Sequence, residues 1–387
     1  MVIALTVGEI GVRLIGKSDS HGNFLVQGRR VKPYHLPTGG LEEKVASYLL
    51  NGPSAGIGYD PVLGWSPFPN TESAGGMAHH GTAGIRSAST STEYAPNSLQ
   101  GTLRIALFGD SFTWGAEVPD DGTWGYFLER SLNRSGLDAE VLNFGVPGYG
   151  IDQAFMRWKL DGAQFSPDVV IFGYQAENGK RNLNIYRPFY APDTSGIFSK
   201  PRFVIETDQL KLVNSPTVPP DELPDFVENF GTWEYTEYEY FYDPDDFEDR
   251  IWLKSRLIST VLEVSSKLYK RSVEAEEFYS LSREPGRLAM RIIQDFAKDV
   301  EASGGDFYVV HIPKRDALQS HSSGDQLIYS ELMDAIRESH IMIDPLDELL
   351  EESKKSSVDA LYMPRGHLSV SGNEVVGAEI AKVLLAQ

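Results

Sequence analysis

The sequence contains no cysteine, and this absence removes several kinds of site at once. Disulfide bonds, thiolate-bound metals and a cysteine nucleophile are all excluded. Basic residues are also scarce: 35 Lys and Arg stand against 55 Asp and Glu, and the net charge is −20. Because nucleic acids and anionic membranes repel such a charge, neither is expected as a partner, and a neutral or cationic substrate is favoured.

Long hydrophobic runs are missing as well. No segment reaches the roughly 18–20 apolar residues that a membrane-spanning helix needs. Met1–Val7 is apolar, but Glu9 interrupts it and no basic residue precedes it, so no standard signal peptide is predicted. A chain trimmed just after a membrane anchor would begin in the same way, and the sequence assigns no compartment and no oligomeric state.

The chain nevertheless has enough apolar residues for a large core, since 41% of its 387 residues are hydrophobic. Residues 1–100 are rich in Gly, Pro, Ser and Thr and predict an irregular, partly β extension that packs on a core built elsewhere. His79 and His80 lie in this region. Adjacent positions seldom bind one metal, so we interpret them as loop residues, and no metal site is predicted.

Residues 101–387 alternate between strand and helix patterns. Strands are predicted at 104–108, 140–144, 168–173, 306–312 and 341–343, and helices at 122–132, 152–162, 285–302, 326–339 and 372–386. This alternation is typical of a parallel sheet flanked by helices. We therefore predict an α/β fold, a three-layer α/β/α sandwich with a parallel central sheet.

An insertion over about 193–284 interrupts the alternation. Within residues 221–250 there are twelve acidic residues, one basic residue and nine aromatic residues. Insertions of this size are often lids or interaction surfaces, and spaced aromatic rings with carboxylates would suit a sugar or an amphipathic acyl substrate. The alternative is a self-packed subdomain with a solvated acidic face.

Polar and glycine residues follow several of the predicted strands. The apolar run Ile105–Phe108 ends at Gly109-Asp110-Ser111, the next strand runs into a glycine-rich segment ending at Gly148-Tyr149-Gly150, and Asn178 follows the third strand. His367 precedes the last helix. Because the carboxyl ends of parallel strands meet at one edge of a sheet, these groups are expected to converge. A hydroxyl, a base and neutral hydrogen-bond donors are the parts that acyl transfer requires.

These segments resemble the motifs of the SGNH (GDSL-type) hydrolase superfamily. The resemblance rests on four stretches of sequence, namely Gly109–Gly115, Asn143–Gly148, Gly173–Asn178 and Gly366–Ser369 with Gly372. Two further segments, Tyr59–Trp65 and Gly84–Ser87, are similar to a stretch that precedes the catalytic motif in bacterial members. That branch is related to polysaccharide O-acetyl esterases and acetyltransferase-like domains, and it permits an exported or membrane-anchored parent chain.

The resemblance implies a role for each matching residue. Ser111 would be the nucleophile and His367 the general base, while the Ser111 and Gly148 amides and the Asn178 side chain would form the oxyanion hole. Gln175 is an alternative to Asn178, because the third motif departs from the family's Gly-Asn-Asp pattern.

The acid that orients the histidine is missing from its usual place. The family has it two or three residues before the His, where this chain has Arg365 and Pro364. Asp359 is the nearest upstream carboxylate, so either Asp359 orients His367 or a backbone carbonyl does so in a Ser–His dyad.

The expected function is serine-dependent ester hydrolysis that removes acetyl or short acyl groups from a carbohydrate, with no cofactor. An O-acyltransferase would use the same residues, with a sugar hydroxyl in place of water. The missing acid also leaves open a catalytically weakened carbohydrate-binding protein.

Overall fold

A computed structural model of the chain describes residues 2–53, 56–73, 75–192 and 194–387. Its centre is an eight-stranded sheet in the order β15-β14-β11-β9-β10-β8-β7-β6. The five strands from β15 to β10 run parallel, whereas β8, β7 and β6 continue the sheet in antiparallel fashion. The strands are β6 Thr71–Glu72, β7 His79–His80, β8 Arg86–Ser87, β9 Leu103–Gly109, β10 Ala139–Asn143, β11 Val169–Tyr174, β14 Asp306–His311 and β15 Ile341–Ile343.

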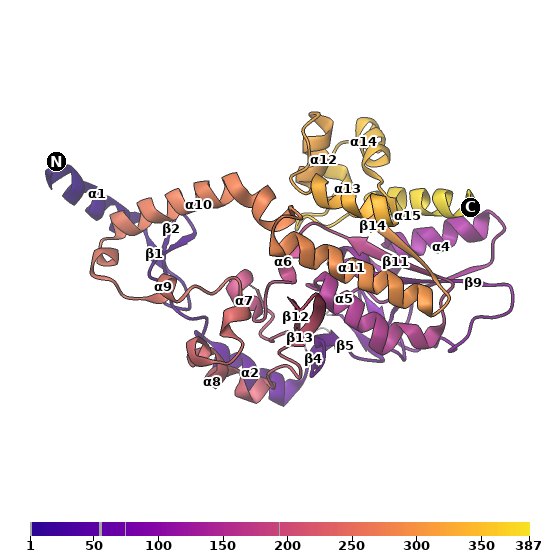
Figure 1. The fold of residues 1–387 in the computed structure, drawn as a ribbon, viewed down its shortest axis with the longest axis horizontal. Coiled ribbons are helices and arrows are strands. Elements are labelled where there is room, and N and C mark those ends of the chain that lie inside the picture. Colours follow the sequence, from indigo (N-terminus) through magenta and orange to yellow (C-terminus); the bar gives the residue numbers. More distant parts are fainter. Residues whose placement is uncertain (1, 54–55, 74, 193) are drawn as a thin grey trace.

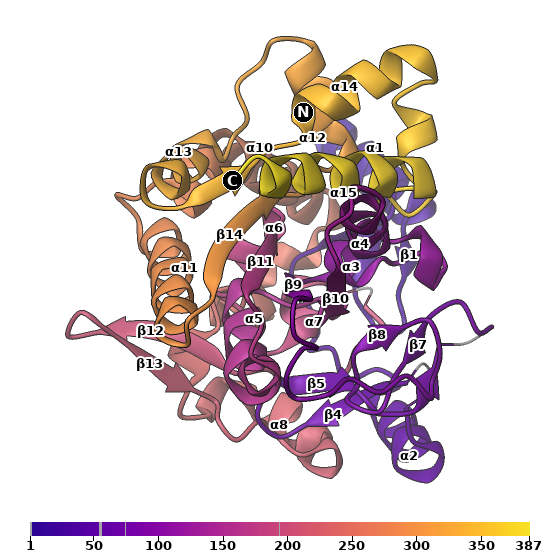
Figure 2. The same cartoon turned by 90° about the vertical axis from the view of Figure 1, so that its right-hand side faces the viewer.

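Helices cover both faces of this sheet (Figures 1 and 2). The helices of the core are α4 Trp124–Arg134, α5 Ile151–Arg157, α11 Glu284–Ala302, α13 Ser330–Ser339, α14 Leu346–Lys355 and α15 Val370–Leu385. Side chains of β9 alternate between the faces: Ile105 and Leu107 pack with α4 and α15, whereas Phe108 packs with α5 and α11. The α/β fold with a mainly parallel sheet, predicted from the alternation of patterns, is therefore confirmed.

Several helices were not predicted from the sequence. Among them are α1 Val2–Ile15, α2 Leu41–Asn51, α12 Arg315–Ser322 and α14. The N-terminal region is nevertheless largely built from short strands, including a three-stranded sheet of β1 Lys17–Ser18, β2 Phe24–Val26 and β3 Arg29–Val31, and a pair of β4 Ile57–Asp60 and β5 Gly64–Pro67. The division into an extension over 1–100 and a hydrolase domain over 101–387 stays a prediction.

The insertion folds as a layer against the N-terminal region. It contains the hairpin β12 Arg202–Glu206 and β13 Gln209–Val213, the helices α8 Leu223–Glu228 and α9 Pro244–Phe247, and the 24-residue α10 Arg256–Tyr279. Its aromatic side chains pack on one another, as Phe226 and Trp233 do at a centroid distance of 4.9 Å. Leu223 and Phe230 join a common cluster with Leu41 and Trp65. This packing favours the self-packed alternative over a row of free sugar-stacking rings.

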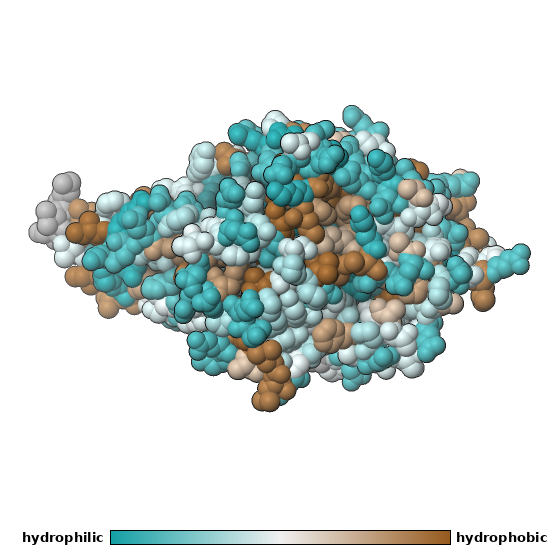
Figure 3. Space-filling model, turned by 60° about the horizontal axis from the view of Figure 1, so that its bottom comes forward, coloured by the Kyte–Doolittle hydropathy of each residue, from teal (hydrophilic) through white to brown (hydrophobic). Residues whose placement is uncertain are grey.

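Helices α1 and α10 lie side by side and project from the α/β core (Figure 1). The carboxylate of Glu9 accepts hydrogen bonds from the backbone N–H groups of Arg256 and Leu257, so α1 caps the N-terminus of α10. Hydrophobic side chains are exposed along this arm (Figure 3); on α1 they are Leu5, Val7, Ile10, Leu14 and Ile15. Over the described residues, no helix combines the length and the apolar character needed to cross a bilayer.

Candidate active site

The loop between β9 and α3 (Ser111–Trp114) presents Ser111 at the carboxyl edge of the sheet. Gly109 has a φ of 153°, and a Cβ at this position would lie 2.3 Å from Thr113 Oγ1 and 2.9 Å from the Gly173 carbonyl oxygen. Only glycine therefore lets β9 pass β11 and turn at once into the helix. Asp110 caps α3, since its carboxylate accepts a hydrogen bond from the Phe112 N–H at 2.9 Å.

His367 reaches Ser111 from the loop before α15. Its Nε2 lies 2.9 Å from Ser111 Oγ, within hydrogen-bond distance, and its ring packs on Phe112 with the centroids 4.9 Å apart. The loop is closed by a hydrogen bond from the Met363 N–H to the His367 carbonyl at 2.7 Å. Two groups separated by 256 residues are thus brought into the arrangement of a nucleophile and its base.

The carboxylate beside the histidine belongs to Glu117, which the sequence analysis did not single out. Glu117 Oε2 lies 2.7 Å from His367 Nδ1, and its other oxygen accepts a hydrogen bond from the Arg365 N–H at 3.1 Å. Partial burial acts to raise the pKa of Glu117, but the hydrogen bonds from His367 and Arg365 outweigh it and hold this pKa below its ordinary value. The group is therefore an anion where an imidazolium would form.

Asp359, the predicted acid, is placed elsewhere. Its largely exposed carboxylate pairs with Arg315 at 3.1 Å. Asp359 lies in the short 3-10 turn Asp359–Leu361, which precedes the segment that leads to His367. This turn contacts the segment through its backbone, since the Ser369 N–H donates a hydrogen bond to the Leu361 carbonyl oxygen. In the structure, Glu117 and not Asp359 is therefore the carboxylate in contact with His367 Nδ1.

Glu117 depends on a loop that Arg86 holds in place. The Arg86 guanidinium donates to the carbonyl oxygens of Trp114, Gly115 and Val118, on both sides of Glu117, and to Asp120 at 2.9 Å. Glu117 itself has a φ of 70°, a conformation that costs a non-glycine residue of order 1 kcal/mol or more. The buried Arg86 contacts offset this cost and direct the carboxylate toward His367.

A second loop places the Gly148 amide. Trp65 Nε1 donates to the Pro147 carbonyl at 3.0 Å, and Tyr149 Oη donates to the Trp65 carbonyl at 2.6 Å. Two hydrogen bonds to Trp65 thus hold the Gly148 loop against the segment Tyr59–Trp65. In the described part of the chain, neither the Ser111 N–H nor the Gly148 N–H has a hydrogen-bond acceptor.

Asn178 is not arranged as the sequence predicted. It lies at the start of α6 (Glu177–Arg181), and its Nδ2 donates to Asp110 Oδ2 and to the Tyr149 carbonyl, both at 3.1 Å. Its side chain therefore ties the Ser111 loop to the Gly148 loop and has no N–H left for a ligand. Gln175, the alternative, is buried, and its Nε2 donates to no acceptor among the described residues.

His311 is also accounted for by the fold. Its buried ring contacts Asp344 through Nδ1 at 2.9 Å and Tyr329 Oη through Nε2 at 3.0 Å. Both ring nitrogens are satisfied, which makes His311 a structural residue of the sheet edge.

His80 is a buried histidine that supports the nucleophile helix. Its Nε2 accepts a hydrogen bond from Trp114 Nε1 at 3.1 Å, and its Nδ1 lies 3.1 Å from Thr71 Oγ1. Burial lowers the pKa of His80 from 6.5 to about 4, and the charges of Arg157 and Arg86 act in the same direction. The folded protein therefore keeps His80 neutral at pH values where the unfolded chain binds a proton.

This difference predicts a loss of stability on acidification. The contribution of neutral His80 is complete above pH 6.5 and is lost as the pH falls toward about 4. At pH 5 the free energy of unfolding should be roughly 2 kcal/mol lower than at pH 7 from this group alone. Urea unfolding of wild type and His80→Gln, followed by tryptophan fluorescence at both pH values, measures it. Equal pH dependence in the two proteins would contradict the assignment.

We compared the chain with known families, curated proteins and solved structures. Residues 105–195 match the family model described as GDSL-like lipase/acylhydrolase. A search of the curated proteins found no match. Among solved structures, a protein assigned to the lipolytic G-D-S-L family of Desulfitobacterium hafniense DCB-2 is 11% identical, with a TM-score of 0.37, over 73% of this chain and 99% of its own.

Two esterases are among the other similar structures. An acetylxylan esterase from Geobacillus stearothermophilus is 11% identical, with a TM-score of 0.37, over 72% of this chain and 93% of its own. Another acetyl xylan esterase is 14% identical, with a TM-score of 0.37, over 73% of this chain and 99% of its own. The segment 105–195, which holds the Ser111 and Gly148 loops, is thus the part of the chain that matches the GDSL-like lipase/acylhydrolase family.

Proposed function

We propose that this protein is a serine-dependent ester hydrolase. One observation carries the proposal: Glu117, His367 and Ser111 form a continuous line of contacts of 2.7 and 2.9 Å. A hydroxyl in contact with a base, whose far nitrogen contacts a carboxylate, is the arrangement that activates serine for attack on a carbonyl. The alternative of a weakened site depended on a missing acid, and we propose Glu117 as that acid.

The reaction would proceed in two balanced halves. Ser111 Oγ forms a bond to the ester carbonyl carbon while its proton passes to His367 Nε2, and the carbonyl oxygen becomes an oxyanion. Collapse of this intermediate breaks the bond to the alcohol, which leaves with the proton from Nε2. In the second half, water attacks the carbonyl carbon of the acyl-enzyme and gives a proton to His367 Nε2. The bond between this carbon and Ser111 Oγ then breaks, the carboxylic acid leaves, and His367 returns the proton to Ser111 Oγ.

The remaining groups stabilise charge during these steps. The Glu117 carboxylate accepts a hydrogen bond from His367 Nδ1–H. It thereby stabilises the imidazolium that forms each time Nε2 takes up a proton. The N–H groups of Ser111 and Gly148 are the proposed donors to the oxyanion. Gln175 is proposed as a third donor, because its Nε2 has no other acceptor in the described chain, whereas the amide of Asn178 is already bonded.

The substrate we propose is a carbohydrate that carries acetyl or short acyl esters. Ser111 is only 9% exposed, and limited access to the nucleophile favours a small acyl group. The groups that adjoin the Gly148 loop are the ring of Trp65 and the guanidinium of Arg187, which suit a polar alcohol better than a lipid chain.

Covalent labelling tests the site. A fluorophosphonate probe should modify one residue of the folded protein, Ser111, because only an activated serine attacks phosphorus readily. Mass spectrometry of the digested protein locates the adduct. Protein unfolded in urea is the control and should remain unlabelled. An adduct on any other residue of the folded protein, or none at all, would contradict the proposal.

A further inference from the structure

The cations around the site are almost all neutralised by carboxylates. Arg181 contacts Asp110 at 2.6 Å and Glu177 at 3.1 Å. Lys314 also pairs with Glu177, and Lys180 pairs with Glu274. This cluster therefore consists of fixed, mutually compensated charges, and it offers a free ligand little.

Arg187, which lies beside the Gly148 loop, is not part of this compensated cluster. It begins the short helix α7 (Arg187–Tyr190), and its Nη1 donates to the Gly148 carbonyl at 3.1 Å. The Tyr190 ring lies 5.6 Å from its guanidinium carbon and holds the group in place by a cation–π contact. Arg187 has no carboxylate within ion-pair distance in the described chain, and its other N–H groups have no acceptor there.

The charge of Arg187 is held at an energetic cost. Burial lowers its pKa to about 10, and repulsion from Arg181 adds to this effect. The more distant carboxylates of Glu177 and Asp110 only partly compensate. An anion beside the partly exposed guanidinium would offset this cost, because it would favour the charged form of Arg187.

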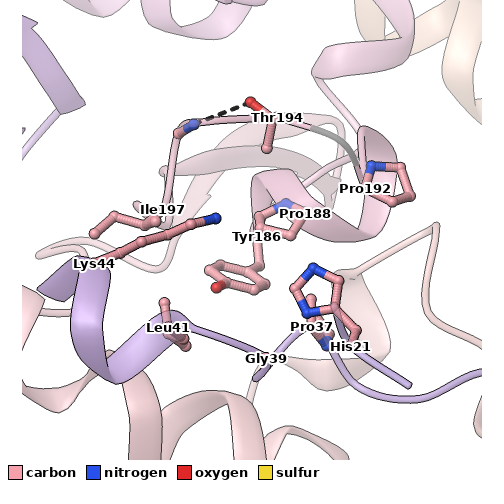
Figure 4. A pocket seen from close by; sticks show the side chains of 11 residues that line it. His21, Pro37, Gly39, Leu41, Lys44, Tyr186, Pro188, Pro192, Thr194 and Ile197 are labelled. Atoms are coloured by element: carbon pink, nitrogen blue, oxygen red, sulfur yellow. Dashed lines mark hydrogen bonds between the residues drawn. The ribbon is translucent and has the colours of Figure 1, made fainter. Parts of the chain in front are cut away.

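The positive charge of Arg187 lies close to the proposed oxyanion donor on the Gly148 loop. Its neighbours Tyr186 and Pro188 line a pocket together with His21, Leu41 and Ile197 (Figure 4), and Arg187 is not among the residues that line it. Arg187 itself contacts Gly148, whose N–H is the proposed oxyanion donor. A ligand group bound by Arg187 would therefore lie next to the ester under attack.

The geometry points to a subsite at Arg187 for a carboxylate of the substrate, so that the ester would be carried by an acidic saccharide such as an acetylated uronide. This inference rests on the proposed function and narrows its substrate class. The planar fork of a guanidinium matches a carboxylate in two parallel hydrogen bonds. One surplus positive charge also balances a monovalent carboxylate, whereas a phosphate dianion would leave a negative charge uncompensated.

A matched pair of substrates tests the subsite. Acetylated methyl glucuronide and acetylated methyl glucoside differ only in a carboxylate that replaces a primary alcohol. Wild type should prefer the uronide in kcat/KM by about 10- to 100-fold, as expected for a charge-assisted pair. Arg187→Gln should reduce the ratio of the two kcat/KM values to near one, and Arg187→Lys should retain part of it. Arg134→Gln, at the exposed C-terminal end of α4, removes the same charge and should keep the wild-type ratio.

Ligand binding separates the subsite from the hydrolase proposal. In a Ser111→Ala background, calorimetry should detect tighter binding of methyl glucuronide than of methyl glucoside, by about tenfold or more. The added Arg187→Gln change should abolish the difference. Tighter binding of methyl glucuronide together with no hydrolysis by the wild-type protein would support the subsite and refute the hydrolase. If wild type hydrolysed both substrates with equal kcat/KM and Arg187→Gln left this ratio unchanged, the subsite would be refuted and the hydrolase proposal would stand.

Discussion

Replacing Ser111 with alanine should lower kcat/KM for p-nitrophenyl acetate by at least about 10³-fold. The substitution removes the Oγ that forms the acyl-enzyme and leaves the oxyanion donors intact, so only the slow attack by water remains. His367 would lose its 2.9 Å contact with Ser111, but the contact with Glu117 would keep the ring in place. Initial rates measured from p-nitrophenolate release, corrected for spontaneous hydrolysis, give the ratio.

Ser135→Ala is the matched control for this experiment. Ser135 is exposed at the C-terminal end of α4, and its hydroxyl only donates to the Ser131 carbonyl at 3.0 Å. Its removal should leave the rate within about twofold of wild type. Similar rates for wild type and Ser111→Ala, with both proteins folded by circular dichroism, would mean that the hydrolysis does not pass through this serine.

Much of the site could be predicted because its parts follow local rules. A buried run that stops at Gly109 places Ser111 at the end of a strand, and parallel strands bring their carboxyl ends to one edge. His367 could be placed in the same way, because it lies just before the last helix, in a loop at the same edge of the sheet. Each position depends on a few neighbouring residues and on the direction of one strand or helix, and both are visible in a sequence.

The acid escaped prediction because its position depends on distant residues. Glu117 lies six residues after Ser111, in a loop with no strand or helix pattern of its own, and it reaches His367 only because Arg86 binds the carbonyls around it. Arg86 lies in an upstream segment that the resemblance had marked. An acidic residue close behind the nucleophile, in a chain that lacks the usual acid, was the one available signal.

Total charge was a poor guide to the electrostatics of the site. The net charge of −20 favoured a neutral or cationic substrate, yet the group left uncompensated beside Gly148 is Arg187. Many acidic residues lie in the insertion, and charges there are screened within about 10 Å at ordinary ionic strength. The potential felt by a substrate is set by the nearest partly buried groups, and a composition cannot say which of these lack a partner.

Replacing Glu117 with glutamine should lower kcat by about 10²- to 10⁴-fold with little change in fold. The amide has nearly the same shape, but it cannot stabilise the imidazolium, and its NH₂ group can force the His367 ring into the wrong tautomer. Asp359→Asn is the matched control, because Asp359 pairs with Arg315 at the surface; its kcat should stay within about twofold of wild type. Steady-state rates of all three proteins with p-nitrophenyl acetate give the comparison.

The two variants also distinguish a triad from a dyad. In a dyad, a backbone carbonyl would orient His367 and both variants would resemble wild type. If Asp359 were the acid, its variant alone would be slow. Glu117→Asp adds a third test, since the shorter side chain keeps the charge but retracts it from a contact of 2.7 Å. Its kcat should therefore lie between those of wild type and Glu117→Gln, because charge without the direct hydrogen bond supplies only part of the stabilisation.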